Sequence, residues 1–328
     1  MRNLITDVPG IRVGNAHDAR LASGVTVALF EAPTVAGVAV LGGGPGTRET
    51  DMLAPENVAP GVDAIVLAGG SAFGLDAASG VQAWLRENGR GLQVGDARVP
   101  LVSQAIMFDL LNGGDKDWER YPPYRELAHA AVSDAGVDFA LGSAGGGYGA
   151  TTVNLKGGLG SASAMTASGF TVGALVIVNS ISSVVVADGP HFWAAPFERD
   201  GEFGGRGLPP AITPEMLTLT WKGAPVRATT IALVATDATL DKGTAKRLAI
   251  SAHGGLHKAL RFAHGFTDGD TVFAAATARN ARPVDVDAVI EICAVAGDCL
   301  ARAVARGVYA ATALPGSPLP AWKDRFEK

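Results

Sequence analysis

The feature that most constrains the fold is an apolar run that opens with two threonines, Thr229 and Thr230, and continues without a charge to residue 236. A short uncharged run of this kind is typical of a strand buried in a sheet. We therefore expect residues 229–236 to form a buried strand, with Ala228 immediately before it and Asp237 immediately after it.

Glycine and proline residues divide the rest of the chain into short strands and a few helices. Further strands are expected at residues 24–30 and 35–41, as a pair closed by a turn at 42–46, at 64–67, at 170–187 as a second pair, and at 271–276. Helices are expected at residues 74–87, 124–135, 241–263 and 285–306, and polar loops at 112–124 and 188–217. This order favours a layered α/β sandwich over a strict βαβ series, in a single domain covering residues 1–328.

The composition restricts the classes of partner. The net charge is −5 and no long basic run is present, which argues against nucleic acid. The most apolar stretch, residues 170–187, is interrupted by Asn179 and by serines, so it is expected to form buried strands rather than a membrane span. The first residues lack the apolar core of a secretion signal. Hydrophobic residues make up 48% of the chain and charged residues 18%, so we expect an oligomer that buries part of the surface.

The sequence offers little to hold a metal or a cofactor. The only cysteines, Cys293 and Cys299, point to different faces of a predicted helix, which argues against a disulfide and fits a reduced, cytoplasmic protein. His253 and His257 lack the glutamate of an H-E-x-x-H zinc site and are expected to be a surface pair. The glycine-rich stretches 42–46 and 145–152 lack the residues of a phosphate loop and are interpreted as turns. We therefore expect neither a metal nor a cofactor.

A more specific chemistry is indicated when Thr229 is combined with the later sequence Asp268-Gly269-Asp270. A threonine at a free N terminus carries a hydroxyl nucleophile and, in its α-amine, a general base with a pKa of roughly 8. Producing that terminus requires scission between Ala228 and Thr229, and two carboxylates are suited to orienting the ammonium and hydroxyl groups. Taken separately, the same residues are ordinary features, a threonine at a strand edge and a tight turn.

Three further polar residues have both a structural and a catalytic interpretation. Asn179, inside an apolar run, is either a strand-end turn residue or an amide donor for a tetrahedral oxyanion. Lys156, in a glycine-rich loop, is either a solvated lysine or a group that binds a carboxylate or polarises a carbonyl. Ser71 follows a strand, but Phe73 replaces the glycine of the G-x-S-x-G nucleophile motif, so a helix N-cap explains Ser71 better.

Several stretches of the chain resemble one family. Residues 5–14, 43–51 and 67–77 are similar to the DmpA-type self-processing N-terminal-nucleophile hydrolases, which include β-peptidyl aminopeptidases and nylon-oligomer hydrolases. The resemblance covers nearly the whole chain. It implies a four-layer α/β sandwich, autocleavage into residues 1–228 and 229–328, and a homotetramer of the cleaved αβ units.

The resemblance also implies roles for individual residues. The nucleophile falls on Thr229, the amide of the oxyanion site on Asn179, and the acidic pair on Asp268 and Asp270. Lys156 lies where the active-site lysine of the nylon-oligomer branch is expected, and the two threonines at the cut also make this branch the nearest in motifs.

The chain departs from the family pattern at three points. Residue 228 is alanine where asparagine or glycine is expected, the segment 100–109 lacks the glutamate that holds a substrate ammonium in aminopeptidases, and Phe108 replaces a tyrosine at the substrate site. The last two departures favour endo-type hydrolysis of short linear amides over release of N-terminal residues from peptides or amino-acid amides. Ala228 and Phe108 also leave open an unprocessed binding protein of the same fold, and a hydrolase that uses Ser71 is a further alternative.

Overall fold

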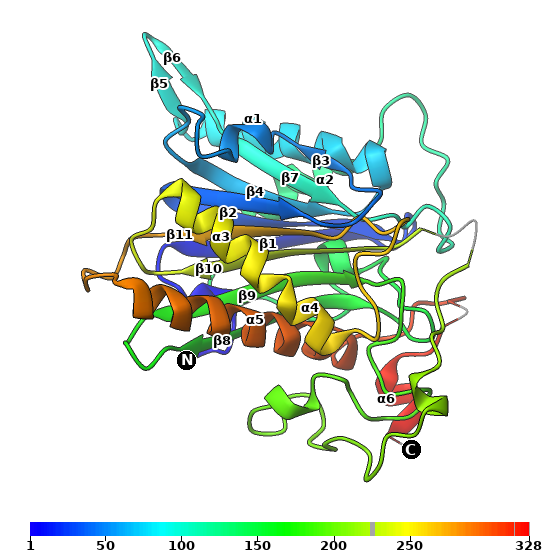
Figure 1. Ribbon diagram of the computed structural model, residues 1–328. Coiled ribbons are helices and arrows are strands. Elements are labelled where there is room, and N and C mark those ends of the chain that lie inside the picture. Colours follow the sequence, from blue (N-terminus) through cyan, green and yellow to red (C-terminus); the bar gives the residue numbers. More distant parts are fainter. Residues whose placement is uncertain (224–226, 318, 328) are drawn as a thin grey trace.

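The long strand β2 (Ser23–Val40) joins the two halves of the central sheet (Figure 1). The computed structural model describes residues 1–223, 227–317 and 319–327. Within these residues the strands form a nine-stranded sheet in the order β3-β7-β4-β2-β11-β10-β9-β8, with β1 paired to β2. A separate hairpin of β5 and β6 projects from one end of the molecule.

The remaining strands are shorter than β2. The strands are β1 (Ile11–Asp18), β3 (Thr47–Arg48), β4 (Val62–Ala68), β5 (Leu92–Val94), β6 (Ala97–Val99), β7 (Val102–Ile106), β8 (Gly158–Met165), β9 (Thr171–Asn179), β10 (Thr229–Thr236) and β11 (Thr271–Ala276). The helices are α1 (Ala77–Glu87), α2 (Tyr124–Ser133), α3 (Lys242–Ala252), α4 (Gly254–Ala259), α5 (Val286–Tyr309) and α6 (Trp322–Phe326).

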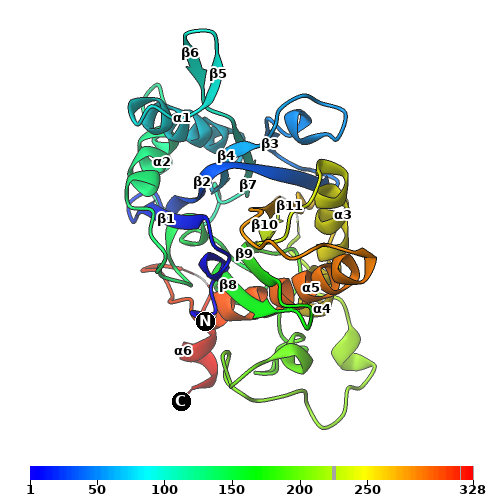
Figure 2. The same ribbon diagram turned by 90° about the vertical axis from the view of Figure 1, so that its left-hand side faces the viewer.

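The sheet and the helices form four layers (Figure 2). Helices α1 and α2 cover the half of the sheet that contains β4 and β7, and helices α3, α4 and α5 cover the half that contains β8 to β11. Because successive side chains of a strand point to opposite faces, Val66 of β4 packs under α1 and α2 while Ile65 enters a core between the two sheet halves. In the same way, Val234 of β10 faces the other helix layer and Leu233 faces the inner core. The predicted four-layer α/β sandwich is confirmed.

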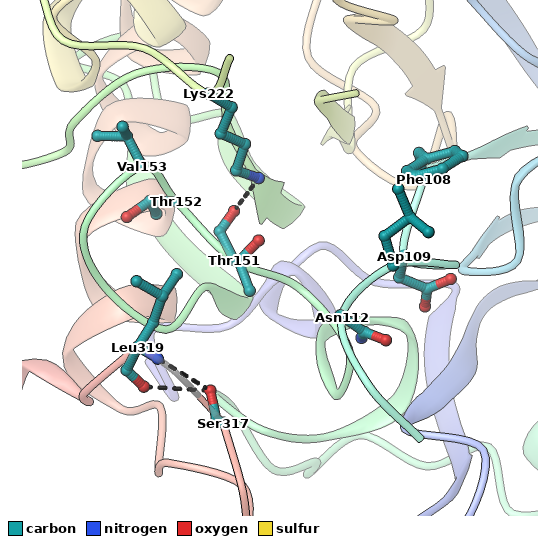
Figure 3. Close-up of a pocket in the computed structure, with 10 residues that line it drawn as sticks. Phe108, Asp109, Asn112, Thr151, Thr152, Val153, Lys222, Ser317 and Leu319 are labelled. Carbon is teal, nitrogen blue, oxygen red and sulfur yellow. Dashed lines mark hydrogen bonds between the residues drawn. The ribbon is translucent and has the colours of Figure 1, made fainter. Parts of the chain in front are cut away.

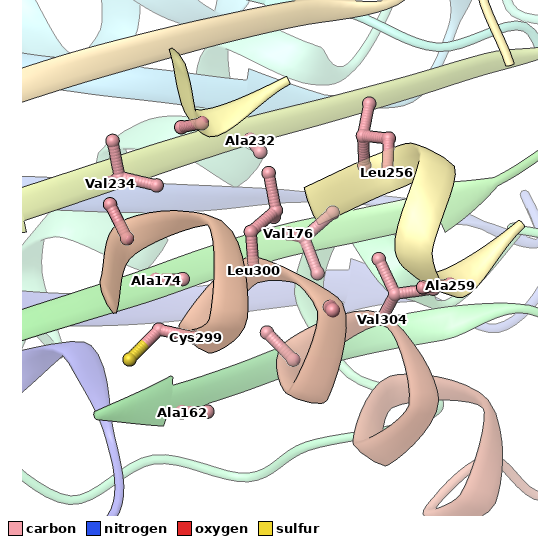
Figure 4. Close-up of a cluster of buried hydrophobic side chains, with 14 of the residues drawn as sticks. Ala162, Ala174, Val176, Ala232, Val234, Leu256, Ala259, Cys299, Leu300 and Val304 are labelled. Carbon is pink, nitrogen blue, oxygen red and sulfur yellow. The ribbon is translucent and has the colours of Figure 1, made fainter. Parts of the chain in front are cut away.

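Helix α5 packs directly on β8 and β9 through small residues. Its Leu300 and Val304 belong to the same buried cluster as Val176 of β9 (Figure 4). The strand β8 has no room for a side chain at the contact, because a Cβ at Gly160 would lie 1.8 Å from the carbonyl oxygen of Ala303. The glycines of β8 are therefore explained by close packing against a helix and not by a preference for strand conformation.

The central strands β10 and β11 have the predicted bounds, but the two predicted strand pairs are wrong. Residues 24–30 and 35–40 belong to the single strand β2, whose ladder shifts between Leu29 and Thr34, where it leaves β4 for β11. In the run 170–187 only β9 is a strand, because its two antiparallel partners, β8 and β10, lie outside this run. The local sequence pattern therefore does not predict which strands pair with each other in the sheet.

The predicted helix 241–263 is divided into α3 and α4 at His253. His253 is buried, and its Nε2 lies 3.0 Å from the carbonyl oxygen of Ala39 in β2, whereas His257 is exposed. The prediction of a surface pair is therefore wrong for His253. The cause is the position of the helix junction, which packs against the sheet instead of continuing along the surface.

The described part of the chain has few features that point to membranes or metals. Across residues 1–223, 227–317 and 319–327, no helix is long and apolar enough to cross a membrane, and no cluster of three or more histidine, cysteine or acidic side chains is arranged to hold a metal ion. Cys293 and Cys299 are both free thiols, and Cys299 is buried against β9.

Candidate active site

Thr229 is the first residue of β10, the strand that lies between β9 and β11. In the antiparallel register its Cα pairs with that of Asn179, the last residue of β9, while Ala228 forms a parallel bridge with Asp268, just ahead of β11. All four residues are buried. The sheet therefore brings residues that are far apart in the sequence together at one end of its central strands.

The carbonyl group of Ala228 is held by two donors. The Thr229 hydroxyl donates to the carbonyl oxygen at 2.5 Å, and the backbone N–H of Gly269 donates to the same oxygen at 3.1 Å. The hydroxyl thus contacts the carbonyl group that it would attack in a self-cleavage. A backbone donor already faces the oxygen on which negative charge would then develop.

The two aspartates have different environments. Asp270 is fully buried: its Oδ1 accepts the N–H of Thr230 at 2.7 Å, and its Oδ2 accepts the backbone N–H of His264 at 2.9 Å and lies 2.9 Å from the ring Nδ1 of the same residue. Asp268 is also buried, and its Oδ1 has no hydrogen-bond partner among the described residues. Burial, together with the charge of Asp270 and a hydrogen bond to it, raises the pKa of Asp268 to about 8. Asp268 in the uncut chain is therefore mostly protonated at neutral pH.

In a chain kept uncut by Thr229→Ala, we expect Asp268→Asn to become more stabilising as the pH rises. The folded chain keeps the Asp268 proton up to about pH 8, whereas an unfolded aspartate loses its proton near its ordinary pKa of 3.8. Between these values the native state binds more protons than the unfolded state, so the stability of the uncut parent falls with rising pH. The amide has no proton to lose. The Tm of the variant minus that of the parent should therefore increase by several degrees between pH 5 and pH 8 in a thermal melt, and a flat or falling difference would contradict the assignment.

Asn179 is at the centre of a polar cluster next to Thr229. Its Oδ1 accepts the N–H of Thr151 at 3.0 Å and a hydrogen bond from Nζ of Lys222 at 3.1 Å, and its Nδ2 donates to the carbonyl oxygen of Phe108 at 3.0 Å. Lys222 also donates to the carbonyl oxygen of Thr151 at 2.8 Å (Figure 3). Neither Thr151 nor Lys222 was predicted as a site residue, because no local pattern marks either of them.

Lys156 is buried and Lys222 is half-buried. Burial lowers the pKa of Lys156 to about 7 and that of Lys222 to about 7, in each case against the opposing effect of a nearby aspartate. The interpretation of Lys156 as a solvated lysine is therefore wrong. Its Nζ donates at 2.7–3.2 Å to the carbonyl oxygens of Gly147, Ala150 and Gly157. Lys156 thus supports the turn that leads into Thr151, and it makes no hydrogen bond to Thr229 within the described chain.

Two cavities lie beside these residues. A cavity of about 310 Å³ is lined by Ala228, Thr229, Phe108 and Phe266, among others. A second cavity, of about 220 Å³, lies between Phe108 and Lys222, which face each other across it in Figure 3. Phe108, the predicted substrate-binding residue, therefore lines both cavities, and both are sized for small molecules.

Ser71 lines the cavity of Thr229 but is a weaker candidate for a nucleophile. Its hydroxyl is hydrogen-bonded to no histidine or carboxylate in the residues that the structure covers, and a serine needs such a base. The predicted N-cap role is also wrong, because Ser71 lies inside the 3₁₀ turn Ser71–Asp76, which Gly70 precedes with a positive φ.

Gly269→Ala is expected to impair any reaction of the Thr229 hydroxyl. A Cβ at position 269 would lie 2.6 Å from Oγ1 of Thr229 and 2.9 Å from the carbonyl oxygen of Gly44, so the hydroxyl must move. Displacement of a reacting atom by about 1 Å costs about 10²-fold in rate. The fraction of chain cut over time, read by mass spectrometry, measures the effect, and Gly254→Ala is the control because a Cβ there meets open space. Equal rates in both variants would show that this contact is unimportant.

Known proteins are similar to this chain over most of its length. The model of Peptidase family S58 matches residues 3–318. An uncharacterized aminopeptidase of Mycobacterium tuberculosis is 43% identical over 348 residues, which cover 99% of this chain and 98% of that protein. A 6-aminohexanoate-oligomer endohydrolase of Kocuria sp. is 27% identical over 285 residues, which cover 83% of this chain and 74% of that protein.

Solved structures share the fold. The l-aminopeptidase d-Ala-esterase/amidase from Ochrobactrum anthropi, described as a variant of the Ntn hydrolase fold, has a TM-score of 0.71 at 23% sequence identity, and the match covers 98% of this chain and 91% of that chain. By overall identity the chain is nearer to the mycobacterial aminopeptidase than to the nylon-oligomer hydrolase, although its site motifs had favoured the latter. The site motifs therefore favour the nylon-oligomer hydrolases, whereas the identity over the whole chain favours the aminopeptidases.

Proposed function

The chain belongs to peptidase family S58 and is an amide-bond hydrolase, and on that premise we propose that its nucleophile is Thr229, made N-terminal by self-cleavage after Ala228. One observation carries this proposal most strongly. The Thr229 hydroxyl and the N–H of Gly269 both donate to the carbonyl oxygen of Ala228.

In the proposed self-cleavage, Oγ1 of Thr229 attacks the carbonyl carbon of Ala228, and the N–H of Gly269 stabilises the oxyanion. The C–N bond then breaks, the freed nitrogen takes up a proton, and Ala228 remains attached to Thr229 as an ester. Water hydrolyses the ester, which leaves a carboxylate on Ala228 and restores the threonine hydroxyl. The products are residues 1–228 and 229–328.

In the proposed turnover, the α-amine of Thr229 takes the hydroxyl proton while the oxygen attacks the carbonyl carbon of the substrate. Asn179 supplies an amide donor for the oxyanion, and its pairing with Thr229 in the β9–β10 register supports this role. Asp268 and Asp270 orient the N-terminal residue, and the bond from the N–H of Thr230 to Asp270 supports this role. The amine of the product leaves with the proton, and water resolves the ester.

We propose short peptides, amino-acid amides and other short linear amides as substrates. The two cavities, of about 310 and 220 Å³, meet at Phe108 and support small ligands. Similarity to an aminopeptidase favours release of an N-terminal residue, whereas the paired aspartates and Lys156 favour cleavage of amide oligomers such as 6-aminohexanoate oligomers. A peptide amide with a free N terminus and its N-acetylated form separate the two: an aminopeptidase hydrolyses only the first, and an endo-acting hydrolase accepts both.

Denaturing mass spectrometry of the purified protein tests the central claim. Two fragments, one ending at Ala228 and one beginning at Thr229, are expected. A single intact chain after long incubation would instead favour an unprocessed binding protein of this fold. Size-exclusion chromatography with light scattering then tests whether the cut chain forms the homotetramer that we also propose.

A further inference from the structure

A cut after Ala228 would leave the nucleophile at the end of a strand, where chains are usually mobile. In the uncut chain, the bridge between Ala228 and Asp268 and the bond from Gly269 to Ala228 help to hold Thr229. Both contacts use Ala228, which belongs to the other fragment after scission. The contacts that remain at the start of β10 are its ladder with β9, in which Thr229 pairs with Asn179, and the N–H of Thr230, which donates to Oδ1 of Asp270 at 2.7 Å.

The other oxygen of the Asp270 carboxylate is held by His264. This oxygen, Oδ2, accepts the backbone N–H of His264 at 2.9 Å, and the ring Nδ1 of His264 lies 2.9 Å from the same oxygen. An ionised carboxylate only accepts hydrogen bonds, so Nδ1 carries the hydrogen. The Asp270 side chain is fully buried and that of His264 is only 14% exposed, so water contributes little to this contact.

The His264 ring is packed between two other histidines. The ring centroids of His253 and His257 each lie 4.7 Å from that of His264, and both rings meet it nearly edge to face. His253 is anchored in turn by the bond between its Nε2 and the carbonyl oxygen of Ala39 in β2. This histidine cluster of residues 253, 257 and 264 therefore connects the α3–α4 junction and the sheet to Asp270, and no step of the proposed reaction uses it.

We propose that His264 is a positioning residue of the Thr229 site, which fixes the start of β10 by clamping Asp270 against the N–H of Thr230. The proposal rests on the proposed function, since positioning matters most when Thr229 is a free end. Residues that orient a reacting group in this indirect way typically contribute about 10- to 100-fold to activity. The effect should appear in kcat more than in KM, because His264 lines neither of the two cavities described above.

The backbone of His264 permits a matched pair of variants. Its φ is +61°, a region that glycine and asparagine adopt readily. His264→Gly removes the ring without straining the backbone, and His264→Asn keeps an N–H donor close to the position of Nδ1. We expect the glycine variant to lose about 10- to 100-fold in kcat with little change in KM, and the asparagine variant to recover most of that loss.

Amide hydrogen exchange at Thr230 supplies a readout that does not depend on activity. In the uncut Thr229→Ala chain, exchange at Thr230 should be faster with His264→Gly and close to the parent with His264→Asn. Equal exchange in all three chains would overturn the proposal. A glycine variant whose KM rises by the same factor as its kcat falls would also overturn it. If the wild type proves to be uncut, the proposed function fails, but the exchange comparison still decides whether His264 holds Asp270 and Thr230.

Discussion

Thr229→Ala should yield a single uncut chain of 328 residues that does not hydrolyse amides. The substitution removes the hydroxyl that contacts the carbonyl oxygen of Ala228, and with it both the attacking atom of self-cleavage and the nucleophile of turnover. Loss of a nucleophile costs about 10⁴-fold or more in kcat. Denaturing mass spectrometry reads the cut, and turnover of a short peptide amide reads the activity.

Two neighbouring variants separate loss of chemistry from loss of folding. Thr229→Ser keeps a hydroxyl at the same atom and should still be cut. Thr230→Val removes a buried hydroxyl that has no partner in the described residues and leaves the N–H bond to Asp270 in place, so this variant should be cut and active. A Thr229→Ala chain that is cut and active would eliminate the proposed mechanism.

The central strands were predictable because their environment is simple. Residues 229–236 and 271–276 are buried on both faces, so their sequences are short apolar runs bounded by polar residues, and the runs coincide with β10 and β11. The convergence of Thr229 with Asp268 and Asp270 was predictable only in part. The sequence shows the two motifs, but the parallel pairing of β10 with β11 is what brings them together.

Other strands were not predictable from local patterns. The strand β8 consists largely of glycine, alanine and serine, which have weak strand preference, and it forms because it pairs with β9 while α5 packs closely on its glycines. The sequence also wrongly predicted a break within β2, again because the deciding contacts are tertiary. One continuous strand serves both halves of the sheet, and only the tertiary arrangement of β4 and β11 reveals this.

The outer part of the site depends on long-range contacts as well. Lys222 reaches Asn179 and Thr151 from an irregular segment, and His264 reaches Asp270 from a loop with a positive φ. Neither position has a distinctive spacing in the sequence. Lys156 is a different case: the glycine-rich sequence around it suggested a solvated loop, whereas those glycines allow backbone carbonyl groups to close around its ammonium.

Asn179→Ala should lower kcat for amide hydrolysis by about 10²- to 10³-fold, the range found when one oxyanion donor is removed. Asn179 pairs with Thr229 across the β9–β10 ladder, and one of its two amide hydrogens is used by the carbonyl oxygen of Phe108. The proposed role assigns the other hydrogen to the substrate oxyanion. The loss should appear in kcat, because the donor is needed most when charge develops in the transition state.

Asn179→Asp distinguishes this role from a structural one. The carboxylate keeps an acceptor for the N–H of Thr151 and for Lys222, but it has no N–H to offer, so it should be as inactive as the alanine variant even though these two bonds are restored. Thr151→Val, which removes only a hydroxyl that bonds to Asn179 at 3.3 Å, should change kcat by less than about tenfold. Assays on chains already shown to be cut keep turnover separate from self-cleavage. An Asn179→Asp enzyme with near wild-type kcat would place the oxyanion donor elsewhere, and the backbone N–H of Gly269 would then be the first group to test, since it already faces a carbonyl oxygen beside Thr229.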